Sequence, residues 1–130
     1  MNENVHRLAA ERHFEMASKC DEDFNKEKAK DTKTALMVAA AQNFFYAATN
    51  AIEAVLARKN LHSFNHEDRL NKMLENADLF DDNIIRSYMD LISFGESYRA
   101  KVAYRGENGE KYKKLKQIAS LLLGMFKGLK

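Results

Sequence analysis

The densest group of potential metal ligands and acid–base residues occupies 62–68, which read His-Ser-Phe-Asn-His-Glu-Asp. On a continuous helix His62 and His66 would share one face, because residues four apart lie one above the other. The segment interrupts the apolar pattern on both sides, however, so the spacing rule does not hold across it. Ser63 or Asn65 is better explained as the N-cap of a following short helix, since a short polar side chain accepts a hydrogen bond from an unpaired backbone N–H. We therefore favour a structural junction over a metal or catalytic site.

A second group of residues suited to chemistry lies late in the chain, where cations alternate with tyrosines. Its members are Arg99, Lys101, Tyr104 and Arg105, preceded by Tyr98. An arginine beside a tyrosine can hold a phosphate by charge and a base by stacking. Composition alone favours another explanation, in which the cations complement the dipole at a helix C-terminus and the tyrosines are half-buried.

The charge of the chain is unevenly distributed. Its net charge is +2, but residues 98–130 contribute +7 and residues 1–97 contribute −5. This asymmetry predicts a basic surface that could meet an anionic partner such as RNA or a nucleotide. A solvated helix that simply carries lysines explains the same numbers equally well.

Other potential ligands are sparse. There is no HExxH zinc motif and no glycine-rich phosphate loop, and a single cysteine excludes cysteine-based zinc sites. Cys20 stands at an apolar position of an amphipathic pattern, so we expect a small core residue. His6 and His13 share a face but lie nearly two turns apart, too far to hold one metal ion without help. The sequence thus predicts no metal and no cofactor.

The element that must position these groups is a helix over 34–56. It has no glycine or proline and one charged residue, Glu53, and its apolar residues recur at three- and four-residue steps. A helix that is apolar nearly all round is usually buried among others. Asn50 and Glu53 are three apart and share a face. They are either inward polar companions of a binding site or a pair that hydrogen-bonds to a neighbouring helix.

The rest of the chain also shows helical spacing. We expect further helices at 4–26, 65–78, 83–104 and 110–127. The polar segment 25–33 should connect the first two helices, with Asp31 or Thr32 as the next N-cap, and Asp81 or Asp82 should begin the fourth helix. The prediction is a single all-α domain, 1–130, an up-and-down antiparallel bundle of four longer helices and one short helix.

The composition also bears on the compartment. One cysteine fits a reducing cytoplasm, the N-terminus lacks an apolar leader region, and no run approaches the ~20 apolar residues needed to cross a bilayer. These features predict a soluble cytoplasmic protein with no membrane contact.

The order of these features resembles the HEPN superfamily of small helical-bundle proteins. The stretch FFYAATNAIEAVLARK (44–59) is similar to its second helix, HSFNHEDRLNKML (62–74) to its histidine-containing junction, and RAKVAYRG (99–106) to its late arginine–tyrosine segment. The resemblance covers about 8–127. It implies a bundle that usually forms a homodimer and acts in toxin–antitoxin, defence or RNA-processing systems.

Some HEPN proteins are metal-independent endoribonucleases, and others are inactive partners of small nucleotidyltransferases. The nuclease signature is an arginine followed, after four to six residues, by a histidine. Here Tyr104 stands where that histidine would follow Arg99. Because a tyrosine ordinarily titrates near pH ~10, it is a poor acid–base catalyst at neutral pH.

The resemblance therefore implies a dimeric binding protein for RNA, nucleotide or a partner nucleotidyltransferase. Its contact residues would be Arg99, Lys101, Tyr104 and Arg105, with Asn50 and Glu53 as companions. Two alternatives remain. One is an endoribonuclease with a composite site across the dimer, using Arg99 with Tyr104, His62 or His66. The other is a silent structural partner subunit.

Overall fold

A computed structural model describes residues 2–98 and 109–128 of the chain. Their helices are α1 (Glu3–Lys26), α2 (Lys30–Ala57), α3 (His66–Glu75), α4 (Asp82–Tyr98) and α5 (Gly109–Gly128). No strand occurs in these two ranges, so the predicted all-α helical bundle is confirmed. None of the helices in this part of the chain is both long and apolar enough to span a membrane.

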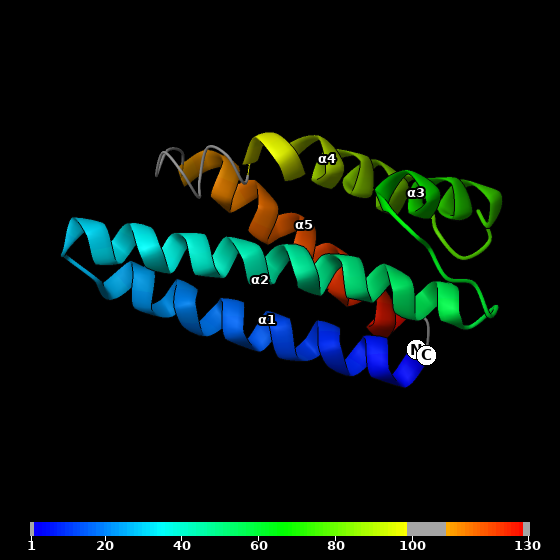
Figure 1. Cartoon of the computed structure of the whole chain (residues 1–130), viewed down its shortest axis with the longest axis horizontal. Helices are drawn as coiled ribbons and strands as arrows, with labels where there is room; N and C mark the ends of the chain where they lie inside the picture. The colour runs from blue at the N-terminus through cyan, green and yellow to red at the C-terminus, as the bar shows by residue number, and fades with distance from the viewer. Residues whose placement is uncertain (1, 99–108, 129–130) are drawn as a thin grey trace.

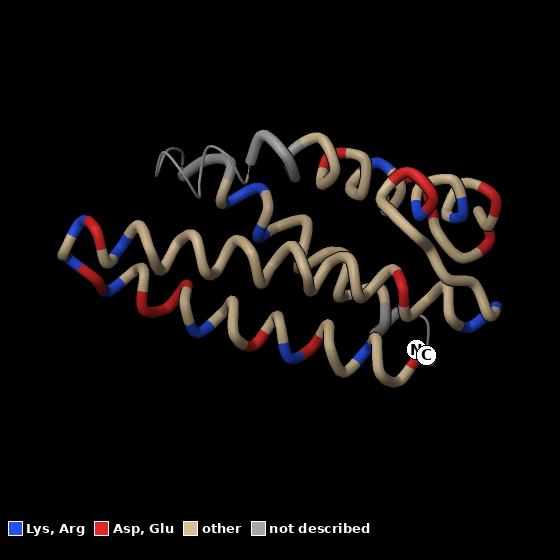
Figure 2. Tube along the Cα trace, in the orientation of Figure 1, with Lys and Arg blue, Asp and Glu red and all other residues tan. Residues whose placement is uncertain are grey.

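Helix α2 is the centre of the bundle, as predicted. α1 runs antiparallel along one side of it, α5 crosses its other side, and α4 packs on α5 and α3 (Figure 1). Charged residues recur along α1 but are nearly missing from the middle of α2 (Figure 2). Burial of α2 on several sides accounts for this difference, because a charge without a partner is costly away from water.

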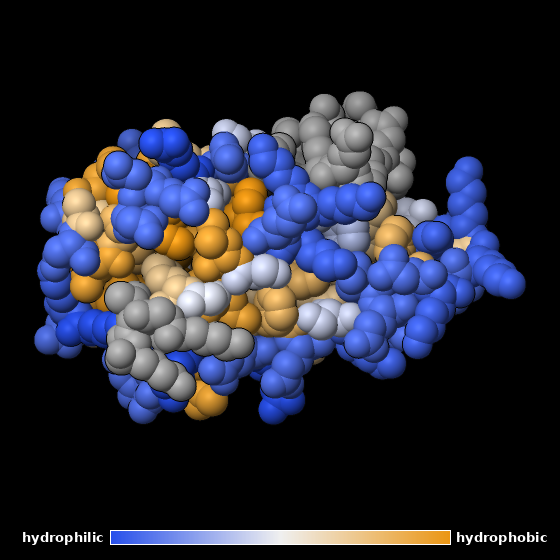
Figure 3. Space-filling model, turned by 180° about the vertical axis from the view of Figure 1, so that it is seen from behind, coloured by the Kyte–Doolittle hydropathy of each residue, from blue (hydrophilic) through white to orange (hydrophobic). Residues whose placement is uncertain are grey.

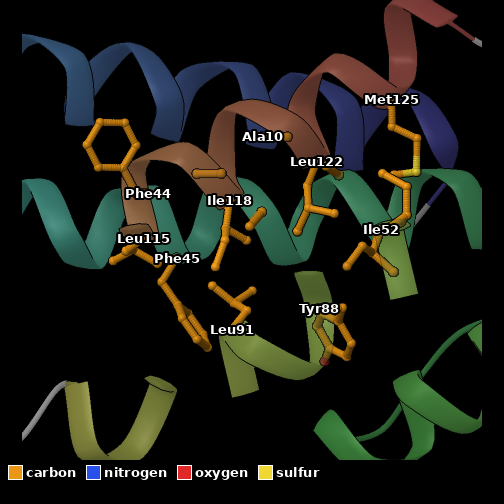
Figure 4. Close-up of a cluster of buried hydrophobic side chains, with 14 of the residues drawn as sticks. Ala10, Phe44, Phe45, Ile52, Tyr88, Leu91, Leu115, Ile118, Leu122 and Met125 are labelled. Carbon is orange, nitrogen blue, oxygen red and sulfur yellow. The ribbon is translucent and has the colours of Figure 1, made fainter. Parts of the chain in front are cut away.

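The core forms where α2, α4 and α5 meet beneath α1. Ile52, Tyr88 and Leu122 are almost completely buried there (Figure 4). Phe44 is equally buried but lies apart from them, with its ring against Phe14 of α1. Alanines of α1 and α2, such as Ala10, allow the two helices to approach closely. The small residues of the sequence thus set the α1–α2 contact, and the large ones fill the space between α2, α4 and α5.

Two of the predicted helix starts are confirmed. Asn65 caps α3, since its Oδ1 accepts a hydrogen bond from the backbone N–H of Asp68 at 2.8 Å. Asp81 precedes α4, and its Oδ1 accepts from the N–H of Ile84 at 2.8 Å. Each cap satisfies a backbone donor that the first helical turn leaves unpaired.

The predicted start of α2 is wrong. The helix begins at Lys30, so Asp31 and Thr32 lie inside its first turn, and the cap position is Ala29. The Glu27 carboxylate instead accepts hydrogen bonds from the backbone N–H groups of Lys28 and Ala29. A polar sequence suggests a connection, but lysine and threonine are also compatible with a solvated first turn of a helix.

Candidate functional site

A polar hollow of about 320 Å³ opens beside the C-terminal end of α2. We call it the histidine pocket. It is lined by His6 of α1, by Thr49, Asn50 and Glu53 of α2, by His62 and Ser63 of the α2–α3 connection, and by Arg69 of α3.

The turn after α2 brings the connection back over the helix. Asn60 adopts a left-handed conformation, with φ of 57°, and the N–H of Leu61 bonds the carbonyl of Leu56 at 3.1 Å. Asparagine tolerates this conformation better than most residues and often ends a helix in this way. Because the chain reverses here, His62 and Ser63 reach Glu53 of the preceding helix.

Two ion pairs hold this end of the bundle. Arg58 Nε lies 2.5 Å from a carboxylate oxygen of Glu3 in α1, and Lys59 Nζ lies 2.7 Å from Asp78. The hydrogen bond from Lys59 lowers the pKa of the Asp78 carboxyl. Besides complementing the dipole at the C-terminus of α2, these two cations therefore make direct contacts to α1 and to the α3–α4 connection.

Glu53 is a nearly buried carboxylate at the base of the histidine pocket. Its side chain is 9% exposed, and its Oε1 accepts hydrogen bonds from Arg69 Nε at 2.7 Å and from the Ser63 hydroxyl. Arg69 is itself only 13% exposed. A charge held this far from water needs a partner, and the two side chains supply one to each other.

The guanidinium of Arg69 extends this network to α4. Its Nη1 donates to the Tyr88 oxygen at 2.9 Å and to Nδ1 of His66 at 3.0 Å. Burial works against the charge of Arg69, but Tyr88 and Glu53 outweigh it and raise the pKa of the guanidinium above its usual value. Arg69 is therefore a permanent cation that joins α2, α3 and α4.

Tyr88 is fully buried, and that burial raises the pKa of its phenol even though Arg69 opposes the shift. The folded protein thus retains the phenol proton at a pH where the unfolded chain has released it. The stabilisation is complete below pH about 10 and is lost as the pH rises through the folded-state pKa.

We expect the free energy of unfolding to fall above pH 10 with a contribution from Tyr88 of at most about 1.4 kcal/mol per pH unit. Urea unfolding across this pH range should give a shallower pH slope for Tyr88→Phe than for the wild type. Equal slopes would show that another group causes the alkaline loss.

Two histidine–asparagine pairs join α1 to α2. His6 Nδ1 lies 3.3 Å from Asn50 Oδ1, and His13 Nδ1 lies 2.9 Å from Asn43 Oδ1. The two histidines are seven residues apart in α1, and the two asparagines are seven residues apart in α2. The same pair therefore recurs two turns further along the antiparallel helices. Only the pair at His6 lies in the histidine pocket.

The structure places the predicted site residues in different parts of the molecule. Asn50 and Glu53 share a face, as expected. They line one pocket, and they hydrogen-bond to His6 of α1 and Arg69 of α3. His62 lines the pocket, whereas His66 begins α3 and faces Tyr88. The helical pattern is interrupted at this junction, as predicted, because α2 ends at Ala57 and α3 begins only at His66. Arg99, Lys101, Tyr104 and Arg105 lie outside the described residues.

Sequence reasoning missed Arg69 and the contribution of His6. An arginine on a short amphipathic helix is ordinarily expected to be a solvated cation. The residues next to Arg69 in the sequence do not indicate that it pairs with the buried Glu53. The heptad match between the histidines of α1 and Asn43 and Asn50 of α2 was a usable signal, because facing positions of antiparallel helices repeat at this interval.

A second hollow, of about 500 Å³, lies on α5 and is lined by Lys113, Lys116, Gln117 and Ser120. We call it the α5 hollow. Lys116 Nζ lies 2.5 Å from the nearly buried carboxylate of Asp21, which also accepts a hydrogen bond from the Tyr112 hydroxyl at 2.7 Å. These bonds attach the basic start of α5 to α1.

The sequence matches no protein-family model, and neither curated proteins nor solved structures provide a match to the chain.

Proposed function

We propose that this chain is a HEPN-like dimeric binding protein that engages RNA through its basic region, residues 98–116. The α5 hollow is the observation that carries the proposal. Lys113 is exposed at this hollow, and Gln117 and Ser120 add an amide and a hydroxyl. Lys116 adds a second ammonium group, whose charge is partly offset by its ion pair with Asp21. Ammonium groups bind phosphates as point charges, and amide and hydroxyl groups hydrogen-bond to sugar and phosphate oxygens.

The sequence next to α5 supports the same ligand. Arg99, Lys101, Tyr104 and Arg105 add three cations and an aromatic ring that can stack on a base. Asn50 and Glu53 line the histidine pocket and not the α5 hollow, so we assign them to that pocket.

Exposed apolar surface supports the proposed dimer. The face turned away from the view of Figure 1 shows apolar side chains between polar borders (Figure 3). Leu121 of α5 and Met89 of α4 are among the large apolar side chains that remain exposed. A second subunit that covered such surface would gain free energy from its burial.

The proposal is tested by fluorescence anisotropy with a short labelled single-stranded RNA over a salt series. If about three phosphates are neutralised, affinity should fall about 18-fold between 50 and 200 mM salt, because bound counterions are released on association. Lys113→Ala and Arg99→Ala should each weaken binding several-fold and make the salt dependence shallower.

The matched control is Lys19→Ala, which removes the same charge from α1, where Lys19 pairs with Asp23. It should bind RNA as the wild type does. Absence of RNA binding, or binding that is indifferent to salt, would reject the proposal and direct attention to a nucleotidyltransferase partner. Cleavage of the RNA in EDTA, abolished in Arg99→Ala, would instead favour the metal-independent endoribonuclease.

A further inference from the structure

Three potential metal ligands from separate segments meet in the histidine pocket. His6 of α1, Glu53 of α2 and His62 of the α2–α3 connection each offer one ligand atom, and these atoms all lie within 4.8 Å of one another. No short sequence motif could reveal this set, because His6 and Glu53 stand in different helices, far apart in the sequence. The folding of α1 against α2 and the turn at Asn60 bring the three together.

The hydrogen bond of His6 to Asn50 occupies one ring nitrogen and leaves the other available as a ligand. The Asn50 amide Nδ2 donates to the carbonyl of Tyr46 at 2.9 Å, so its Oδ1 faces His6 as an acceptor. His6 Nδ1 must therefore carry the proton, and Nε2 has the free lone pair. Metal-binding histidines are typically oriented in this way, by a hydrogen bond from the other ring nitrogen.

Hydrogen bonds also fix the orientation of the Glu53 carboxylate. Both of its hydrogen bonds, from Arg69 and Ser63, end on Oε1. Within the described ranges Oε2 accepts no hydrogen bond. A carboxylate whose first oxygen is held by its surroundings can offer the second to a cation without reorientation.

His62 is the third member of the set. It is exposed at the mouth of the pocket, and no residue in the described ranges hydrogen-bonds its ring. Zinc–ligand bonds are about 2.0–2.1 Å long, so the ligand atoms must come closer together than 4.8 Å. Rotation of the exposed His62 imidazole about its side-chain bonds can bring its nitrogen closer to the other two ligand atoms without moving a helix.

We propose that the histidine pocket binds one Zn²⁺ ion through His6, Glu53 and His62. Two imidazoles and one carboxylate form a ligand set that suits this ion, and the open side of the pocket leaves room for a ligand that the chain does not supply. The proposal departs from the expectation of no metal, which considered His6 only together with His13.

Arg69 should lower the affinity of this site for Zn²⁺. Its positive charge lies 2.7 Å from Glu53 Oε1 and offsets the charge of the only anionic ligand. The site is therefore expected to bind more weakly than one with an unopposed carboxylate. The pair also holds the Glu53 carboxylate in place without the ion, so the base of the pocket is formed before the ion binds.

The test uses the full chain, freed of any affinity tag and treated with EDTA, in competition with a colorimetric zinc indicator. One Zn²⁺ per chain is expected, together with a rise in melting temperature on adding zinc. His62→Ala should weaken binding by about tenfold or more and abolish the rise. Because His62 is exposed, this variant should fold normally, which circular dichroism can verify.

The matched control is His13→Ala. His13 makes the same bond to asparagine one heptad along α1, but it has neither Glu53 nor His62 beside it. Zinc binding by His13→Ala should equal that of the wild type. Wild-type protein that binds no zinc, or zinc binding that is unchanged in His62→Ala, would overturn the proposal. The RNA experiment reports on α5 and is independent of this result.

Discussion

Replacement of Arg69 by alanine should lower the free energy of unfolding by about 3 kcal/mol, because it leaves the Glu53 carboxylate with no cationic partner. Both side chains of the pair are nearly buried, at 13% and 9% exposed, and Arg69 also holds Tyr88 and His66. Both side chains keep some contact with solvent, which places the expected loss at the lower end of the range for a broken buried pair. Urea denaturation at neutral pH measures the change.

A double variant separates the charge from the packing. Arg69→Met together with Glu53→Gln removes both charges and retains side chains of similar length, so it should be more stable than Arg69→Ala alone. A loss below about 1 kcal/mol for Arg69→Ala would contradict the network, because that is the range of exposed ion pairs.

Phe44→Ala should be at least as destabilising, with an expected loss of about 3–5 kcal/mol. Phe44 is 1% exposed, and its ring lies 5.6 Å from that of Phe14 and 6.2 Å from that of Tyr112, between centroids. Removal of the ring therefore leaves a cavity at the point where α1, α2 and α5 meet. Thermal and urea unfolding should show the loss.

Phe64→Ala is the matched control, since it deletes the same ring from a side chain that is 90% exposed. The Lys72 ammonium lies 5.3 Å from the centroid of that ring, a contact with little protection from water. The control should remain within about 0.5 kcal/mol of the wild type. Similar losses for the two variants would mean that Phe44 does not occupy the core.

Much of the bundle is determined locally. The apolar residues of α2 recur on every side, and this pattern by itself predicted a central, buried helix. Asn65 and Asp81 cap α3 and α4 with their own side chains, an interaction that spans only three residues. Such features depend on neighbours in the chain and can be predicted from the sequence.

The histidine pocket depends on tertiary structure. His6 meets Asn50, and Glu53 meets Arg69 and His62, only because α1 lies antiparallel on α2 and the chain reverses at Asn60. The sequence alone determined a helical bundle with a buried central helix, since burial follows from apolar spacing. Only the tertiary structure decided which polar side chains meet, because contacts between distant residues depend on the register and direction of the packed helices.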